Sequence, residues 1–114
     1  MQDNYLVGID NLAVASRAQD ERRTRAAEIA PDFVRVAIAF AYGDIFGRPG
    51  IDARTRVAVA IATVVSARGS TTCLRDLVKA GLNLGWSREE MAETIIPTAP
   101  HIGVHRAREA LADC

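Results

Sequence analysis

The stretch Gly43-Asp44-Ile45-Phe46-Gly47-Arg48-Pro49-Gly50-Ile51-Asp52 joins two apolar segments and says most about the fold. An aromatic-bearing segment stops at Gly47, and a Pro-Gly break then separates Arg48 from Asp52. Proline and glycine interrupt regular structure, and aspartate is a preferred helix N-cap, so we expect a helix on each side. An arginine held at such a junction is suited to bind a carboxylate through two parallel hydrogen bonds.

The two helices beside this junction are predicted to be strongly apolar. The preceding one begins at Pro31 and runs to Phe46, and we expect it to be largely buried because apolar residues cover most of its surface. The following one runs from Ala53 to Ala67 and has no polar face. Its β-branched residues also permit a strand, but its length and alanine content favour a helix. Such a helix is hard to cover in a monomer of 114 residues, so part of it is expected to contact another subunit.

The remaining segments also have helical patterns. A charged helix is expected from about Leu12 to Ile29, after a mobile lead-in over residues 1–11. A fourth helix follows the break at residues 69–72, with its apolar residues on one stripe, and ends at Gly85.

The region after Gly85 contains the clearest local signal. Ser87-Arg88-Glu89-Glu90 is a capping box, which predicts a helix that starts at Arg88. Two prolines then precede a last helix, expected from about His101 to Ala112. The whole pattern predicts an all-α, single-domain bundle of about six helices over residues 1–114.

Composition excludes several classes of protein. The chain is 49% hydrophobic and 25% charged, with a net charge of zero, which is typical of a globular domain and argues against a nucleic-acid partner. It has no apolar run long enough to span a membrane, and its first residues lack the charge and apolar block of a signal peptide. The two cysteines, Cys73 and Cys114, lie far apart, which favours a reduced, cytoplasmic setting over a disulfide.

Three segments together resemble one protein family. They are Tyr42–Arg56, Leu82–Met91 and Ala99–Val104, and in this order and spacing the chain resembles the carboxymuconolactone decarboxylase family, which includes the alkylhydroperoxidase-like proteins. The resemblance covers roughly residues 25 to 112. It implies an all-helical fold that assembles as a homotrimer or homohexamer, with pockets among the helices near subunit contacts.

The catalytic residues of that family are only partly present. Its decarboxylase branch carries a histidine in a Leu-Arg-x-His pattern, and here Leu77 occupies the histidine position. Its peroxidase branch uses a pair of cysteines, and the matching positions here are Ser70 and Cys73. A dithiol cycle needs an attacking thiolate and a resolving thiol, so a peroxidase would have to recruit Cys114. Leu77 also makes this corner apolar, which fits a larger or less polar substrate than a small dicarboxylic lactone.

The only two histidines, His101 and His105, are candidate proton carriers. They are four residues apart, so on one helix they share a face. Histidine has a reference pKa of about 6.5, which suits proton transfer. Alternatively, both are surface residues beside Arg106 and Arg108. A histidine pair can also bind zinc, but no third ligand is evident, so no metal is predicted.

Several other residues are candidates for a binding site. Arg48 is the best anion anchor, although it could instead satisfy carbonyls at the end of its helix. Asp44 lies one turn earlier and could pair with Arg48, and Phe46 and Leu77 would supply apolar contacts. Cys73 is a candidate nucleophile because a helix start would lower its pKa, although a free cysteine is more often a small buried hydrophobe.

The leading hypothesis is a cofactor-independent enzyme that acts on a small organic acid, lactone or polyketide-like ring. The reaction would be decarboxylation or a proton-transfer rearrangement such as isomerisation or cyclisation. Arg48 would hold an anionic group, and His101 with His105 would move the proton, which requires Arg48 and His101 to border one cavity. Two alternatives stay open: a thiol-dependent alkylhydroperoxidase-like antioxidant protein that uses Cys73, and a non-catalytic ligand-binding or assembly subunit.

Overall fold

All regular structure in the described part of the chain is helical. A computed structural model describes residues 20–69 and 71–114, and these contain no strand, which confirms the all-α class. The predicted lead-in and the start of the first predicted helix lie outside the described residues. No helix within the described ranges is long and apolar enough to cross a bilayer.

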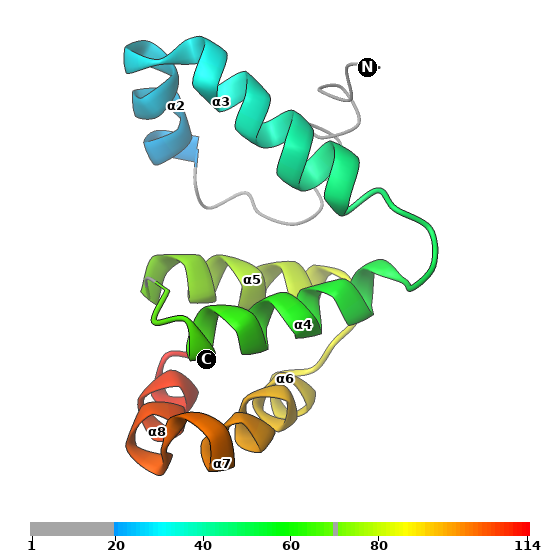
Figure 1. The fold of residues 1–114 in the computed structure, drawn as a ribbon, viewed down its shortest axis with the longest axis vertical. Helices are drawn as coiled ribbons and strands as arrows, with labels where there is room; N and C mark the ends of the chain where they lie inside the picture. Colours follow the sequence, from blue (N-terminus) through cyan, green and yellow to red (C-terminus); the bar gives the residue numbers. More distant parts are fainter. Residues whose placement is uncertain (1–19, 70) are drawn as a thin grey trace. The chain divides into compact units, whose positions relative to one another are not determined.

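The chain divides into two compact units, residues 1–53 and 54–114, here called the N-terminal and C-terminal units (Figure 1). That the two units together form a single domain over residues 1–114 stays a prediction.

The described part of the N-terminal unit is a helical hairpin that ends in a widened turn. It contains α2 (Asp20–Ile29), α3 (Pro31–Ile38) and the π-helix η1 (Ala39–Ile45). Pro31 stands in the first turn of α3, where its missing N–H costs nothing. η1 continues α3, and the N–H of Phe46 donates to the carbonyl of Ala41, five residues back, at 3.1 Å. The helix predicted from Pro31 to Phe46 is therefore present, with π geometry in its last turns.

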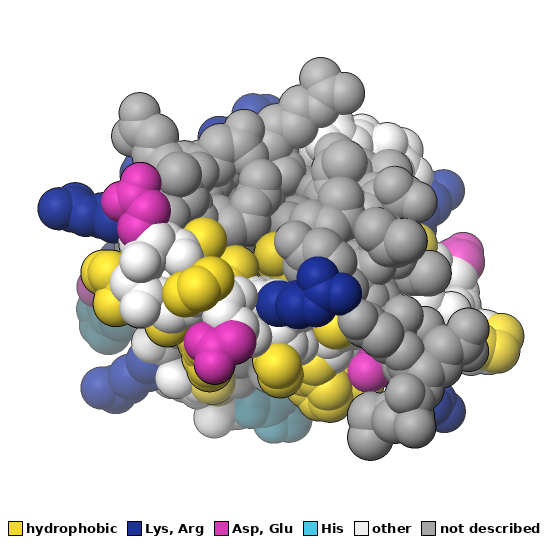
Figure 2. All heavy atoms as spheres, turned by 90° about the horizontal axis from the view of Figure 1, so that it is seen from above, with side chains coloured by type: hydrophobic (Ala, Val, Ile, Leu, Met, Phe, Trp, Pro, Cys, Tyr) yellow, Lys and Arg dark blue, Asp and Glu magenta, His cyan; other side chains and the backbone are white. Residues whose placement is uncertain are grey.

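The prediction that this helix is largely buried is wrong for the described chain. Within α3 and η1, only Ile38 and Gly43 are buried. Phe33 and Phe40 are 70% and 60% exposed, respectively. Figure 2 shows hydrophobic side chains at the surface among acidic and basic ones. An apolar pattern indicates that side chains favour burial, but it does not say which chain covers them.

The C-terminal unit contains the remaining elements, beginning at the boundary with α4 (Ala53–Ser66). These are α5 (Thr71–Asn83), α6 (Arg88–Ile95), the 3₁₀ turn η2 (Ile96–Thr98), α7 (Ala99–Ile102) and α8 (Val104–Ala112). In Figure 1, α4 and α5 form one layer of this unit and α6 to α8 form the other. The helices predicted from Ala53 and from Arg88 are confirmed, and the fourth helix is present but begins at Thr71, within the predicted break at residues 69–72.

The core of this unit is made by buried side chains from α4, α5, α6 and α8. Val57 and Ile61 of α4 and Met91 and Ile95 of α6 are completely buried. Val59, on another face of α4, is 57% exposed, so α4 buries one stripe rather than its whole surface. The predicted contact of α4 with another subunit stays a prediction.

The turn between α5 and α6 is fixed by local and long-range contacts. The capping box is confirmed, because the Glu90 N–H donates to Ser87 Oγ and the Ser87 N–H donates to Glu90 Oε1, each at 3.0 Å. Gly85 has a φ of 100° and ends α5, as predicted. Trp86 donates its indole N–H to the Arg54 carbonyl at 2.8 Å, and the Arg54 guanidinium lies 4.4 Å from the ring centre. Trp86 therefore ties this turn to the start of α4.

The last predicted helix is interrupted. Gly103 has a φ of 101°, in a region that glycine adopts readily, and it separates α7 from α8. His101 lies on α7 and His105 on α8. The prediction that both histidines share one helix face is therefore wrong, because the helical register does not continue through Gly103.

Candidate functional site

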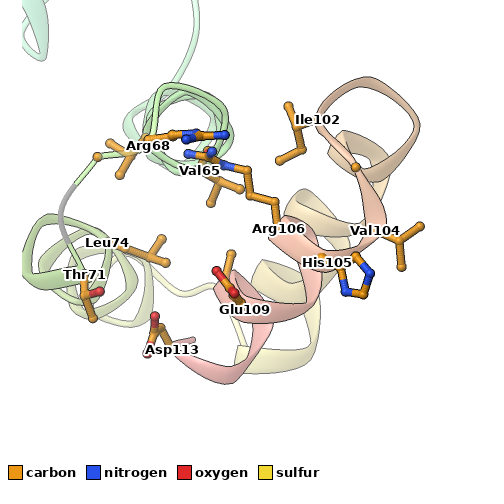
Figure 3. A pocket seen from close by; sticks show the side chains of 14 residues that line it. Val65, Arg68, Thr71, Leu74, Ile102, Val104, His105, Arg106, Glu109 and Asp113 are labelled. Carbon is orange, nitrogen blue, oxygen red and sulfur yellow. The ribbon is translucent and has the colours of Figure 1, made fainter.

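A cavity of about 640 Å³ opens in the C-terminal unit, between the end of α4, the start of α5 and the α7–α8 segment (Figure 3). This volume falls within the usual range for small-molecule sites. Its wall combines apolar side chains with basic and acidic ones. The lining residues include Val65, Arg68, Thr71, Leu74, Ile102, His105, Arg106, Glu109 and Asp113.

The end of α4 places Arg68 in the cavity wall. The Gly69 N–H donates to the Val64 carbonyl at 2.8 Å, which closes the helix, and Arg68 takes the left-handed conformation with a φ of 58°. A non-glycine residue in this conformation costs about 1–2 kcal/mol. A Cβ atom at Gly69 would lie 2.5 Å from Cγ1 of Val64, so a larger residue here would force Val64 to shift. The Arg68 guanidinium makes no hydrogen bond or ion pair with any other described residue.

Arg106 links α8 to the same end of α4. Its Nε donates to the Val65 carbonyl at 2.9 Å, so it satisfies one of the last carbonyls of α4. Arginine has five N–H donors, and the Nη groups of Arg106 bond to no other described residue. Figure 3 shows Arg68 and Arg106 both directed toward the end of α4. Two guanidinium groups therefore lie in one region of the cavity.

Two carboxylates from α8 and the residue after it line another part of the wall. Glu109 and Asp113 are four residues apart, and Asp113 Oδ1 lies 3.7 Å from an Nη of Arg75 on α5. Glu109 makes no hydrogen bond or ion pair with the rest of the described chain. In Figure 3 both acidic side chains point toward the α5 side of the cavity.

His105 lies at the rim of the cavity and has a defined hydrogen-bonding role. Its Nδ1 is 2.8 Å from an Nη of Arg108, and because arginine can only donate, Nδ1 must accept. The neutral ring then carries its proton on Nε2. Figure 3 shows His105 on the side of α8 that faces away from Arg68, Thr71 and Leu74. In this arrangement the imidazole can donate from Nε2, but Nδ1 is occupied.

The other predicted residues of the C-terminal unit do not line this cavity. His101 is exposed on α7, and Leu77 and Cys73 are half-buried on α5. Of the predicted site residues, His105 is the one that the described structure brings to the cavity wall.

The predicted residues of the N-terminal unit lie on or just after η1. Asp44 is within η1, and Phe46 stacks on Tyr42 with ring centres 5.7 Å apart and an interplanar angle of 16°. Arg48 is exposed, and its N–H donates to the Ile45 carbonyl. The hypothesis that Arg48 and His101 border one cavity joins residues of different units and stays a prediction.

The pKa of the Cys73 thiol differs from the one expected from the sequence. Burial, followed by the nearby negative charge of Asp76, raises the pKa of Cys73 above its ordinary value. The predicted lowering of this pKa by the helix start is therefore wrong, because desolvation and the carboxylate oppose the thiolate. Neither Cys73 nor Cys114 is in a disulfide. No group of three His, Cys, Asp or Glu side chains in the described residues is arranged to hold a metal ion.

Sequence reasoning missed Arg68, Arg106 and Glu109. An arginine two residues after a helix end is an ordinary capping residue, so Arg68 had no distinguishing signal. Arg106, Glu109 and Asp113 follow an i, i+3, i+7 spacing, which places three charges on one face of the last helix. The spacing of that stripe is a signal that can be read from the sequence.

Comparison with known proteins identifies the family. The profile of the carboxymuconolactone decarboxylase family matches residues 31–112. The 4-carboxymuconolactone decarboxylase of Acinetobacter baylyi (strain ATCC 33305 / BD413 / ADP1) is 32% identical over 80 residues, which cover 70% of this chain and 59% of that protein. The match therefore spans less than two thirds of that relative's length. Since the family profile covers most of the chain and every cavity-lining residue except Asp113, this chain belongs to the carboxymuconolactone decarboxylase family.

Proposed function

We propose that this chain is a cofactor-independent enzyme that acts on a small organic acid, lactone or polyketide-like ring, by decarboxylation or by a proton-transfer rearrangement such as isomerisation or cyclisation. The family and the relative named as a decarboxylase support a decarboxylase-like activity. The observation that carries the proposal is the cavity, in which two guanidinium groups lie in the same wall as the carboxyl group of Glu109.

Both reaction types require the same two functional groups in the active site of a protein. In decarboxylation, the bond between a carbon and its carboxyl group breaks, carbon dioxide leaves, and the electron pair stays on the carbon. An adjacent carbonyl takes up this charge as an enolate, and the carbon then accepts a proton. In isomerisation, a base removes the proton first and returns it at another carbon. Each route needs a cation near the enolate oxygen and a group that carries the proton.

The cavity contains residues that could fill both roles, the cation near the enolate oxygen and the proton carrier. Arg68 and the Nη groups of Arg106 would hold the substrate's anionic group and stabilise the enolate. The carboxyl group of Glu109 would carry the proton. His105 would donate a hydrogen bond from Nε2 at the rim, because its Nδ1 accepts from Arg108. The set predicted from the sequence, with Arg48, Asp44, Phe46, Leu77 and His101, is the rival site for the same reaction.

Substitutions of cavity residues and of the residues predicted from the sequence would show which of the two sets forms the active site. Carbon dioxide release would be measured on 4-carboxymuconolactone and on related monocarboxylic lactones. Arg68→Ala is expected to lower kcat/KM by about 100-fold, because it removes a cation from the developing charge. Arg88→Ala removes an exposed arginine outside the cavity and should have little effect. Loss of activity in Arg48→Ala and His101→Ala, with Arg68→Ala unaffected, would place the site elsewhere.

The peroxidase alternative is disfavoured by the raised pKa of Cys73, since the thiolate is the form that reacts with peroxide. It predicts a sulfenate on Cys73 after peroxide treatment of the Cys114→Ser variant, which mass spectrometry would detect. A non-catalytic binding or assembly subunit predicts no turnover of any acid or lactone.

Assembly as a homotrimer or homohexamer and a cytoplasmic location belong to the same proposal. The exposed apolar side chains of α3 support the assembly, because a second subunit could cover them. Light scattering coupled to size-exclusion chromatography would give the number of subunits.

A further inference from the structure

The charges in the cavity wall are separated by sign. Arg68 follows α4 by two residues, and Arg106 Nε is bonded to Val65 in the last turn of α4, so both cations lie at the α4 end. Asp113 lies 3.7 Å from Arg75 on α5, and Glu109 is one helical turn before Asp113. Figure 3 shows this division, with the guanidinium groups at the α4 end and the carboxyl groups toward α5.

The two acidic groups differ in how their charges are balanced. Asp113 has Arg75 as a partner, whereas Glu109 has no ion-pair partner among the described residues. Within the described residues, the cavity therefore presents unpaired hydrogen-bond donors near the end of α4 and the acceptor oxygens of Glu109 on the side toward α5. An ionised carboxylate only accepts hydrogen bonds, so Glu109 attracts a donor and repels a second anion.

We infer that the ligand of this cavity carries one anionic group and, at its opposite end, a hydrogen-bond donor such as a hydroxyl group, and that a compound with carboxylates at both ends is rejected. This inference rests on the proposed site and narrows its substrate class. The anionic group binds Arg68 and Arg106, and the donor binds Glu109. A second carboxylate in place of the donor would face the charge of Glu109, which no described residue balances through an ion pair.

Three flat acids of similar size test this inference by binding alone. The probes are 4-hydroxybenzoate, with one carboxylate and a hydroxyl donor opposite it, terephthalate, with two opposed carboxylates, and benzoate, with neither second group. Isothermal titration calorimetry at constant ionic strength would give each dissociation constant. For the unchanged protein, 4-hydroxybenzoate is expected to bind about tenfold more tightly than terephthalate. The reason is that the second carboxylate of terephthalate would lie a few ångströms from Glu109, and like charges at that distance in a partly solvated site repel by about this much.

Two substitutions and one control assign the effect to named groups. Glu109→Gln keeps the size and an acceptor oxygen but removes the charge, so it should improve terephthalate binding by about tenfold and leave benzoate unchanged. Arg68→Ala should weaken all three probes. Glu93→Gln changes an exposed acid on α6 outside the cavity and should change none of them.

The inference is overturned if terephthalate binds as tightly as 4-hydroxybenzoate, if Glu109→Gln leaves their ratio unchanged, or if none of the probes binds at millimolar concentration. These binding results are independent of turnover. The expected ratio without turnover of any acid or lactone, by carbon dioxide release or by rearrangement, would keep the ligand class and reject the proposed enzyme. Turnover of a dicarboxylic lactone with the reverse ratio would keep the enzyme and reject the ligand class.

Discussion

The two units of this protein use similar apolar patterns with different results. In the C-terminal unit, side chains from α4 and α6 such as Ile61 and Met91 cover one another completely. In the N-terminal unit, α3 and η1 leave Phe33 and Phe40 mostly exposed, although their sequence is at least as apolar. One unit supplies its own core, whereas the other presents apolar surface. The difference shows that a helix pattern specifies a preference for burial, while the neighbouring elements decide whether it is met.

Core truncations in the two units should differ most. Ile61→Ala removes completely buried atoms and is expected to lower the free energy of unfolding by about 2–5 kcal/mol. Phe40→Ala removes an exposed ring and should cost less than about 1 kcal/mol when the chain is monomeric. Urea denaturation at several protein concentrations would measure both changes. An equal cost for the two variants at the lowest concentration would contradict the contrast.

Helix capping gives a smaller contrast of the same kind. Ser87 caps α6 with its side chain, whereas Ala30, the N-cap residue of α3, has no side-chain cap. We expect Ser87→Ala to destabilise the protein by about 1 kcal/mol and Ala30→Ser to stabilise it by a similar or smaller amount. Urea denaturation would again provide the measurement, and a stabilising Ser87→Ala would contradict the role of the cap.

The contribution of the capping box to stability is expected to depend on pH. The Ser87 N–H bonded to Glu90 lowers the pKa of this carboxyl group below its ordinary value. The stabilisation is therefore present above the ordinary glutamate pKa and is lost as the pH falls through the lowered folded pKa. The difference in stability between the unchanged protein and Glu90→Gln should shrink in acid, and a difference that grows would contradict this sign.

The smallest expected effect concerns the thiol in the packed unit. Because burial and Asp76 raise the pKa of Cys73, its alkylation by iodoacetamide should have a midpoint at higher pH than that of a free thiol. Asp76→Asn should lower this midpoint, since the negative charge is removed. The raised pKa also means that its contribution to stability is present below the ordinary thiol pKa and is lost as the pH rises through the folded value.

The Cys114→Ser background isolates Cys73 in this titration. An alkylation midpoint at lower pH than that of a free thiol would contradict the effect of burial and would support Cys73 as a nucleophile.

Much of the local structure could be predicted because its causes are local. The capping box at Ser87, the glycine end of α5 at Gly85 and the start of α3 at Pro31 each depend on a few neighbouring residues. The break at Gly103 was missed because glycine is compatible with both a continuous helix and a positive φ, and the choice depends on how α7 and α8 pack. That one residue separated the two histidines on which the predicted site depended.

The candidate site was less predictable than the fold. His105 lies in the cavity wall, while its predicted role in moving a proton stays a prediction, and its hydrogen bond with Arg108 restricts its chemistry. Arg68 and Arg106 lie 38 residues apart in the chain and meet at the end of α4. Such a meeting depends on long-range packing, which the spacing of residues does not encode.

The amino-acid sequence alone determined the helical class, the family and most helix ends of this protein, because periodicity, capping and glycine conformations act within a few residues of the chain. The tertiary structure decided which apolar faces are covered, which cations share a cavity and whether burial raises the pKa of a thiol. These properties depend on contacts between distant segments, whose energies change with solvent exclusion and the proximity of charges.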